Sequence, residues 1–358
     1  MKNHTELLQK DLVEILQRLQ SRLGLFREKH FFLTGGTGLY GKWILEFFYF
    51  LSLHGLWQGN LHILSRSPNN FLDANPHFAK LKSFVWHQGT MISFHLPLVE
   101  IDFAIHGAAT SASETFNNYS SIQKLDDNIK GANNFLSNMI RLRVPRLLLL
   151  SSGSVYGAIN PKLTEGISEE ENAAPLTSDL GSSLGHAKRI AEHLFFIRQS
   201  ESNYEFNIAR SFSLLGPFLP LDLHYAAGNF IRNALNQEPL RIRGDGSSIR
   251  SYIYPTDLLV WLFSILLLAP DREIFNVGSH EHLSILSLAQ MINRCSGNTC
   301  GVKFENSLND YSFSSQKLFY PNVSKARELL GLEIGVKLEQ AIVRTLKFYQ
   351  FGVQNSGQ

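Results

Sequence analysis

A glycine-rich turn between a buried strand and a helix constrains the fold of this chain more than any other feature. The turn reads TGGTGLYG at residues 34–41; an apolar run at 30–33 precedes it and a helical pattern at 42–53 follows it. A glycine pattern alone is weak evidence, but one that closes a strand and opens a helix is typical of folds that bind dinucleotides. The turn therefore predicts a parallel α/β sheet with a dinucleotide at its edge.

Each glycine of the turn has its own task in such a fold. Gly35 permits the tight turn, Gly38 lets the backbone approach a pyrophosphate, and Gly41 allows the helix to pack closely on the strand. The backbone amides at the helix N-terminus, where Leu39 and Tyr40 lie, then face the anion. We expect these five residues to contact the cofactor; the alternative is a plain glycine-rich turn.

Strands and helices alternate along the following part of the chain. Further strands are predicted at 61–64, 84–87, 102–106, 146–151 and 206–210, and further helices at 122–143 and 186–199. Such alternation argues for a parallel sheet covered by helices on both faces. The predicted fold class is α/β, a Rossmann-like doubly wound parallel sheet with a smaller C-terminal α/β substrate lobe.

The pattern divides the chain into three parts, and its 358 residues suit about two domains at ~150 residues each. Leucines and an isoleucine at helical spacing make residues 1–28 an N-terminal amphipathic helix, packed either on the main domain or against another subunit. Residues 29–215 form the predicted dinucleotide-binding domain. Proline and glycine then become more frequent, so residues 216–350 are assigned mainly to a substrate-binding lobe, with later segments free to return to the first domain.

Composition argues against several other classes of protein. With 33 basic and 31 acidic residues the net charge is +2, which provides no broad positive field for nucleic acid. The longest apolar run, at 258–269, is shorter than the roughly 20 residues that span a membrane. Cys295 and Cys300 have no histidine cluster beside them, so neither a disulfide framework nor a metal site is supported. We expect a cytoplasmic protein without nucleic acid, membrane or metal partners.

The end of the second predicted strand bears on the choice of cofactor. NAD-binding folds place an acidic residue there to bond the ribose 2′-hydroxyl, whereas this chain has Ser65, Arg66 and Ser67. An arginine flanked by serines suits a 2′-phosphate, which favours NADP over NAD. The alternative is that Arg66 is a solvated loop residue.

Seven segments follow one another in an order that matches a known family. They are TGGTGLYG at 34–41, HGAATSA at 106–112, NIKGANN at 128–134, SSGSVYG at 151–157, AKRIAE at 187–192, GDGSSIRSYIYPTDL at 244–258 and FNVGS at 275–279. Through these motifs the chain resembles the extended short-chain dehydrogenase/reductases, in particular the NAD(P)-dependent nucleotide-sugar epimerases and dehydratases. The resemblance implies a nucleotide-sugar substrate.

The resemblance also implies roles for single residues. Ser152 matches a residue that bonds the sugar hydroxyl being oxidised, Lys188 one that orients the nicotinamide ribose, and Arg250 one that pairs with the sugar-nucleotide phosphates. Further implied contacts to the cofactor come from Ala108, Ala109 and Asn128, and further implied contacts to the substrate from Thr110 and Ser154. Without the resemblance, single residues such as Ser152 and Arg250 have an ordinary structural explanation.

The chain departs from the family pattern at three places. The family has a tyrosine four residues before the lysine to transfer a proton, and Leu184 stands there instead. An aspartate that bonds the adenine in relatives is replaced by Thr90, which offers a weaker contact. Dehydratases carry Asp-Glu, and decarboxylases a Glu, where this chain has Gly153 and Ser154, so the segment looks most like that of the 4-epimerases.

These motifs favour an NAD(P)-dependent nucleotide-sugar 4-epimerase or a related 4-ketosugar oxidoreductase, acting by hydride transfer at sugar C4. The rival hypothesis is a catalytically silent relative that binds a dinucleotide or nucleotide sugar and has a regulatory or assembly role; Leu184 and Thr90 favour it. In relatives, the helices corresponding to 122–143 and 181–200 pair across a two-fold axis, so the resemblance implies a homodimer.

Overall fold

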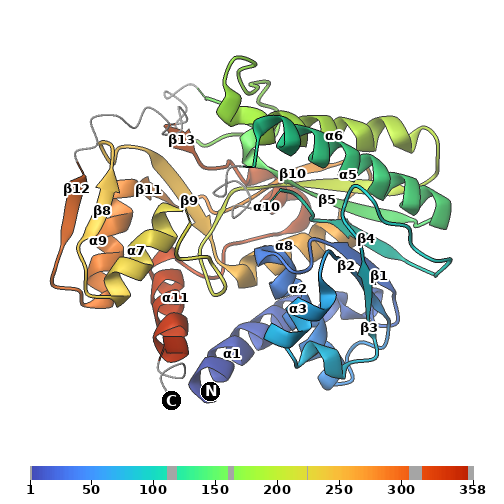
Figure 1. The fold of residues 1–358 in the computed structure, drawn as a ribbon, viewed down its shortest axis with the longest axis horizontal. Coiled ribbons are helices and arrows are strands. Elements are labelled where there is room, and N and C mark those ends of the chain that lie inside the picture. The colour runs from blue at the N-terminus through green and yellow to red at the C-terminus, as the bar shows by residue number, and fades with distance from the viewer. Residues whose placement is uncertain (1, 111–118, 160–164, 224, 306–316, 354–358) are drawn as a thin grey trace.

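A computed structural model defines the architecture of the chain. It describes residues 2–110, 119–159, 165–223, 225–305 and 317–353. Figure 1 shows a large sheet with helices on both of its faces and a smaller lobe beside it.

The large sheet has seven strands in the order β10-β6-β5-β4-β1-β2-β3, and every neighbouring pair is parallel. The strands are β1 (Phe31–Thr34), β2 (Leu61–Ser65), β3 (Phe84–Gln88), β4 (Phe103–His106), β5 (Arg146–Ser152), β6 (Glu205–Ser211) and β10 (Ile274–Val277). From the adjacent central strands β1 and β4, the chain adds β2 and β3 on one side of the sheet and β5, β6 and β10 on the other, as in a doubly wound sheet. The predicted Rossmann-like α/β class is confirmed.

Two layers of helices cover this sheet. On one face lie α5 (Ser121–Leu142) and α6 (Ser183–Gln199), whose buried Phe135 and Phe195 stack at 6.0 Å between ring centroids. On the other face lie α2 (Leu39–Leu53), α3 (Pro68–Ala74) and α8 (Pro255–Leu268). Because α6 begins at Ser183, three residues before the predicted start at 186, position 184 falls in its first turn.

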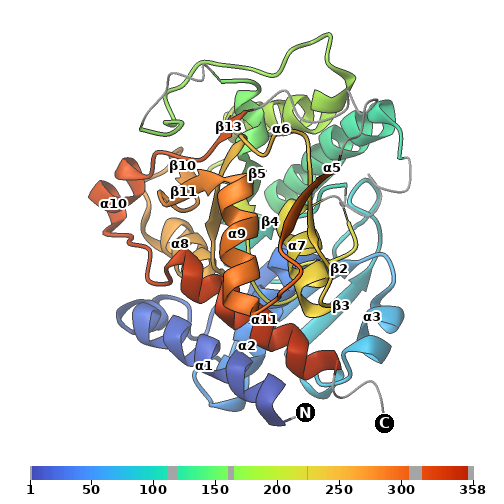
Figure 2. The same cartoon turned by 90° about the vertical axis from the view of Figure 1, so that its left-hand side faces the viewer.

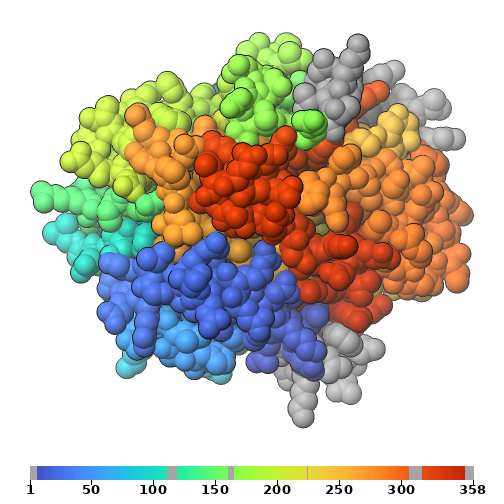
Figure 3. Space-filling model, turned by 180° about the vertical axis from the view of Figure 1, so that it is seen from behind, coloured from blue at the N-terminus to red at the C-terminus, as the bar shows by residue number. Residues whose placement is uncertain are grey.

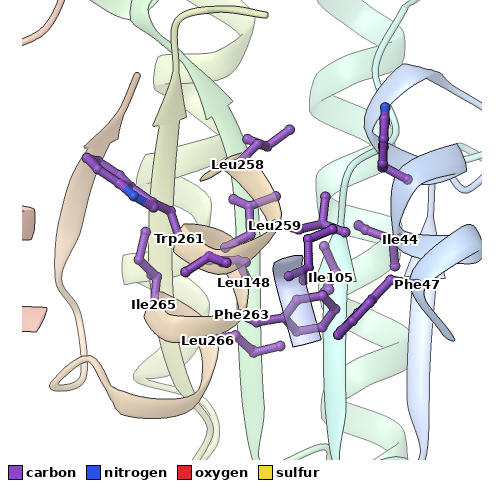
Figure 4. Close-up of a cluster of buried hydrophobic side chains, with 14 of the residues drawn as sticks. Ile44, Phe47, Ile105, Leu148, Leu258, Leu259, Trp261, Phe263, Ile265 and Leu266 are labelled. Atoms are coloured by element: carbon purple, nitrogen blue, oxygen red, sulfur yellow. The ribbon is translucent and has the colours of Figure 1, made fainter. Parts of the chain in front are cut away.

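The largest apolar cluster lies between α2, α8 and the sheet. Phe47 of α2 contacts Phe263 of α8, with 5.6 Å between ring centroids, and Ile105 of β4 and Leu148 of β5 line the same cluster (Figure 4). Fully burying a large apolar side chain stabilises the fold by ~1.5–3 kcal/mol. This cluster therefore fixes the position of α2, and with it the glycine-rich turn from which α2 begins.

The smaller lobe is built mainly from the later part of the chain (Figure 2). Its helices are α7 (Ala226–Leu235), α9 (Ile285–Ser296) and α11 (Leu338–Val353), and its strands are β7 (Ser213–Leu214), β8 (Leu240–Arg243), β9 (Ile249–Ile253), β11 (His282–Ser284), β12 (Val302–Glu305) and β13 (Leu318–Phe319). The chain crosses between lobes more than once, because α8, β10 and α10 (Ser324–Leu330) lie with the large sheet. Strand β7 follows β6 closely and pairs with β9, so it joins the lobe to the sheet.

Helix α1 (Lys2–Leu19) lies along the back of the molecule, against α8 and α11 (Figure 3). The α-helix ends at residue 19, and residues 20–25 continue as a 3-10 helix, so the α-helix is shorter than the segment of residues 1–28 that was predicted to form it. Arg344 of α11 bonds Asp11 of α1 at 2.9 Å. No described helix has the length and apolar character that crossing a membrane requires.

Candidate active site

A cavity of about 1890 Å³ opens at the carboxyl edge of the parallel strands, between the sheet and the smaller lobe. In open α/β sheets, ligands bind at this edge, where the strand order reverses. The cavity wall collects most of the residues that the sequence predicted as a site: Gly35, Gly38, Leu39, Tyr40, Gly41, Ser65, Arg66, Thr90, Ala108, Ala109, Thr110, Ser152, Leu184, Lys188 and Arg250.

The glycine-rich turn forms one end of the cavity, and its glycines are needed for shape. Gly35 has φ +77°, and a Cβ there would lie 2.6 Å from the backbone of Gly107. A Cβ on Gly41 would lie 2.2 Å from the carbonyl oxygen of Gly35. Gly38 is the N-cap of α2 and brings no side-chain cap, so the first amides of the helix are directed to the cavity for an anion.

The adenosine end of a bound dinucleotide would meet the carboxyl end of β2. The buried Ser65 hydroxyl accepts a hydrogen bond from the backbone amide of Ser67 at 3.3 Å. Arg66 lies between them with an exposed side chain on the cavity wall. Thr90, at the end of the next strand, is also exposed on this wall. The arrangement can hold either a ribose hydroxyl or a phosphate.

His106, the first residue of the HGAATSA segment, supports the turn from behind. The Nδ1 atom of His106 lies 2.9 Å from the hydroxyl of Thr34, and that hydroxyl accepts a hydrogen bond from the backbone amide of Ala108 at 3.1 Å. Burial, together with the nearby Lys188 charge, lowers the pKa of His106 to about 3. The ring is therefore neutral and serves to fix the ends of β1 and β4 to each other.

Two of the predicted contact residues do not lie on the cavity wall. Asn128 is buried, and its side-chain amide donates to the hydroxyl of Thr110 at 3.3 Å and to the carbonyl of Lys124 at 2.7 Å. Asn128 thus holds Thr110, which does line the cavity, in place. The Ser154 hydroxyl is buried without a partner among the described residues, while its backbone amide donates to the Ser152 hydroxyl at 3.1 Å.

The centre of the cavity combines Ser152, Lys188 and Leu184. Lys188 is buried, and its ammonium donates to the backbone carbonyl of Leu150 at 2.8 Å. Burial lowers the pKa of Lys188 to about 8, although the nearby Glu192 carboxylate opposes the shift. Leu184 precedes the lysine by one turn of α6 and places an apolar side chain on the wall. This part of the site has a cation and a hydroxyl, with an apolar side chain one turn before the lysine.

A buried polar network lies behind this centre. The Ser151 hydroxyl donates to Glu192 at 2.5 Å, Arg210 pairs with Glu192 at 2.7 Å, and Arg210 also donates to the Tyr156 hydroxyl at 3.0 Å. Tyr156 is fully buried, its hydroxyl donates to Asn276 at 2.8 Å, and burial raises its pKa to about 12. Tyr156 is therefore a structural residue of this network.

The smaller lobe supplies the positive end of the cavity. The Arg250 guanidinium donates to the carbonyl of Ile249 at 2.8 Å and lies 5.8 Å from the ring centroid of Phe319. Burial lowers the pKa of Arg250. Other cations from the lobe also line this end: Arg232, Arg241, Arg243 and Lys317. Such a group suits a diphosphate, which carries negative charge and many acceptor oxygens.

Comparisons with known proteins agree with this geometry. The model of the NAD dependent epimerase/dehydratase family matches residues 31–278. UDP-glucuronic acid decarboxylase 3 of Arabidopsis thaliana is 30% identical over 321 residues, which cover 87% of this chain and 86% of that protein.

Solved structures show the same fold at lower identity. UDP-glucose 4-epimerase of Thermotoga maritima, solved with UDP-glucose, has a TM-score of 0.75 at 20% identity and covers 90% of this chain and 99% of its own. UDP-glucuronic acid 4-epimerase of Bacillus cereus, solved with UDP-glucuronic acid and NAD, has a TM-score of 0.74 at 21% identity, with the same coverage of 90% and 99%.

Proposed function

Because this chain belongs to the NAD dependent epimerase/dehydratase family, we propose that it is a nucleotide-sugar 4-epimerase or a related 4-ketosugar oxidoreductase. One observation carries the proposal. A single cavity runs from the glycine-rich turn, past Ser152 and Lys188, to Arg250 in the smaller lobe. A dinucleotide held at the turn and a nucleotide sugar held at the arginine would meet in the middle of this cavity.

The residues of the turn fit a nicotinamide dinucleotide. The close approach of Gly35 to Gly107 and the open N-terminus of α2 form a cradle that an added Cβ would fill. Such a cofactor, when bound, supplies the group that takes and returns a hydride. We propose that both NAD and NADP bind, and that Arg66 gives NADP the advantage through a 2′-phosphate. The epimerase of Bacillus cereus was solved with NAD, which argues for the opposite preference, and the two nucleotides are to be titrated side by side.

The chain's own residues then have separate tasks around the sugar. The Ser152 hydroxyl accepts its hydrogen bond from the amide of Ser154, so its own proton remains to be donated to the oxygen on the reacting sugar carbon. Lys188 is buried one turn of helix beyond Leu184 and is proposed to orient the nicotinamide ribose. Arg250 holds the diphosphate, and the remainder of residues 216–350 is proposed as the substrate half, facing residues 29–215.

The proposed reaction is limited to hydride transfer. Elimination of water needs an acid and a base beside the sugar, and the positions that follow Ser152 are Gly153 and Ser154, neither of which carries a carboxylate. Although the chain is similar to decarboxylases, we therefore propose that it reduces a 4-keto intermediate back to an alcohol.

We also propose a homodimer formed by α5 and α6. Ile122 of α5 and Ile190 and Ile197 of α6 are large apolar residues that the single chain leaves exposed. A second copy of the same helices would cover them around a two-fold axis. Sedimentation equilibrium is expected to give twice the chain mass; a single-chain mass at micromolar concentration would contradict the dimer.

The function is tested by a product assay on nucleotide-stripped protein. UDP-glucose and UDP-glucuronic acid are incubated with the protein and with NAD or NADP, and the sugar nucleotides are separated by chromatography and identified by NMR. We expect a 4-epimer, or a 4-keto sugar with reduced cofactor. The rival function, a catalytically silent binder, is favoured by Leu184; it predicts calorimetric binding of the same compounds without any new sugar.

A further inference from the structure

The proposed reaction needs a proton acceptor that position 184 does not provide. Oxidation of an alcohol releases a proton as well as a hydride, and a side chain that takes the proton accelerates such steps ~10²–10⁴-fold. Leucine cannot exchange protons. Resting on the proposed function, we propose that Tyr119 and Asp127 together transfer the proton in this chain.

The two residues form a hydrogen-bonded pair on the cavity wall. The Tyr119 hydroxyl donates to the Asp127 carboxylate, across the first two turns of α5. Both side chains line the same cavity as Ser152, Lys188 and Leu184. A phenol that donates to a carboxylate has an oxygen that can accept a proton from a second donor while it passes its own proton on.

The fold brings this pair to the end of α6 that carries Leu184. Helices α5 and α6 follow the parallel strands β4 and β5, so both helices begin at the carboxyl edge of the sheet. The hydroxyl of Ser121 at the start of α5 donates to the carbonyl of Leu180 at 3.0 Å, just before α6. The segment that holds Tyr119 is thereby fixed beside the first turn of α6.

The other described tyrosines on the cavity wall are poorer candidates. The Tyr40 hydroxyl donates to the carbonyl of Phe212 at 3.3 Å, and burial raises the pKa of Tyr40. Tyr225 and Tyr252 belong to the smaller lobe, and burial raises the pKa of each. The Tyr119 hydroxyl donates to a carboxylate on the same wall, which gives its proton a place to go.

The positions of the acidic residues on the cavity wall also favour Asp127 as the acceptor of the Tyr119 proton. Among the described residues, two other acidic side chains line the cavity. Both stand in the smaller lobe, where Asp245 accepts hydrogen bonds from Ser247 and Glu305 pairs with Arg243 at 3.2 Å. Asp127 is the described acidic residue on the sheet side of the cavity.

The step balances in atoms and electrons. The bond between the sugar carbon and its hydrogen breaks, and the hydride passes to the nicotinamide of the bound dinucleotide. The proton of the sugar hydroxyl passes to the Tyr119 oxygen as the Tyr119 proton passes to Asp127, and a carbonyl forms. The return of the hydride to the other face of the sugar reverses each proton movement.

The test compares four variants of the full chain with the parent: Tyr119→Phe, Asp127→Asn, Leu184→Tyr, and Tyr119→Phe combined with Leu184→Tyr. We expect Tyr119→Phe to lower kcat ~10²–10⁴-fold while KM changes less than about threefold, because the loss is in proton transfer rather than binding. Asp127→Asn is expected to lower kcat in the same way. The double variant is expected to regain at least about tenfold of kcat, because the phenol at 184 replaces the lost one.

Controls separate the outcomes. Tyr49→Phe, on α2 against His77 and Phe78 and away from the cavity wall, is expected to leave kcat unchanged. Thermal melting and calorimetric binding of NAD and NADP show that each variant is folded. A Tyr119→Phe variant with the parent's kcat overturns the pair but leaves the proposed function intact. A parent that binds without turnover overturns the proposed function and the pair together, and turnover by Leu184→Tyr alone then identifies a decayed site.

Discussion

The glycine-rich turn at 34–41 and the start of α6 face the same cavity but encode their contributions in different ways. The turn acts through backbone shape, since Gly35 and Gly41 leave no room for a Cβ. The first two turns of α6 act through the side chains of Leu184 and Lys188, which line the cavity. Leucine forms helices as readily as tyrosine does, so its presence leaves α6 in place. A binding site and its chemistry can therefore change independently on one fold.

The largest effect is expected behind α6, where charge rather than shape is critical. Arg210→Met leaves the Glu192 carboxylate buried without its cation, and removing one partner of a buried pair costs about 3–5 kcal/mol. Denaturant titration measures the loss. Arg294→Met, which removes a cation from the exposed pair with Glu339, is the control and is expected to cost less than about 1 kcal/mol. Equal losses in the free energy of unfolding of the two variants would show that the buried pair behind α6 stabilises the fold no more than the exposed pair does.

The turn is expected to respond to shape by a comparable amount. Gly41→Ala places a methyl group 2.2 Å from the Gly35 oxygen and 2.4 Å from the Cα of Gly36, and neither backbone atom can move without shifting β1 or α2. We expect the free energy of unfolding to fall by about 3 kcal/mol and calorimetric binding of NAD to disappear.

Gly24→Ala is the matched control, because a Cβ there meets nothing within 4 Å. Its free energy of unfolding is expected to stay within about 1 kcal/mol of the parent. If Gly41→Ala binds NAD as the parent does, the glycine-rich turn does not depend on backbone shape in the way that distinguishes it from the start of α6.

The buried lysine of α6 predicts a pH dependence of stability. Burial lowers its folded-state pKa from 10.5 to about 8, so between these values the unfolded chain binds more protons than the folded one. The free energy of unfolding of the parent is therefore expected to rise from pH 8 to 10.5, by at most about 3 kcal/mol, relative to Lys188→Met. Urea titrations of both proteins over this range measure the difference. Parallel curves would mean that Lys188 is solvated in the folded protein.

The smallest effect is expected at the exposed end of the cavity. Arg66→Ser removes an exposed cation from the wall and leaves the glycine-rich turn itself unchanged. The Kd for NADP is expected to rise about tenfold, which is about 1.4 kcal/mol, while the Kd for NAD changes less than about twofold. Calorimetric titration with both nucleotides measures this. An equal change for NAD and NADP would mean that Arg66 does not distinguish the 2′ position.

Features that depend on the local backbone could be predicted from the sequence more fully than contacts between side chains. Six of the seven strands in the large sheet lie within about one residue of their expected ends, because each is a short apolar run bounded by local signals. No strand was predicted for the seventh, β10. The positions of the three glycines follow from the same kind of local pattern. Ser152, Lys188 and Leu184 line one cavity. Their place in the sequence motifs was enough to predict a shared site, although the sequence contains no information on the distances between them.

Contacts between distant residues could not be predicted in this way. Arg210 reaches Tyr156 across 54 positions and Glu192 across 18, and no periodicity links them. The family motif assigns Asn128 to the cofactor, but its side of α5 turns inward to Thr110. The pairing of Tyr119 with Asp127 depends on how the chain enters α5, which a motif does not encode.

The attachment of α1 has a consequence for synthesis of the chain. Leu12, Ile15 and Leu19 bury their side chains in the large core, and Asp11 bonds Arg344, which lies 333 positions later. A ribosome adding ~5–20 residues per second needs roughly 20 to 70 seconds to reach that arginine. Throughout that interval Asp11 lacks the cation that it bonds in the folded protein, so this end of α1 can be fixed to α11 only after almost the whole chain has been made.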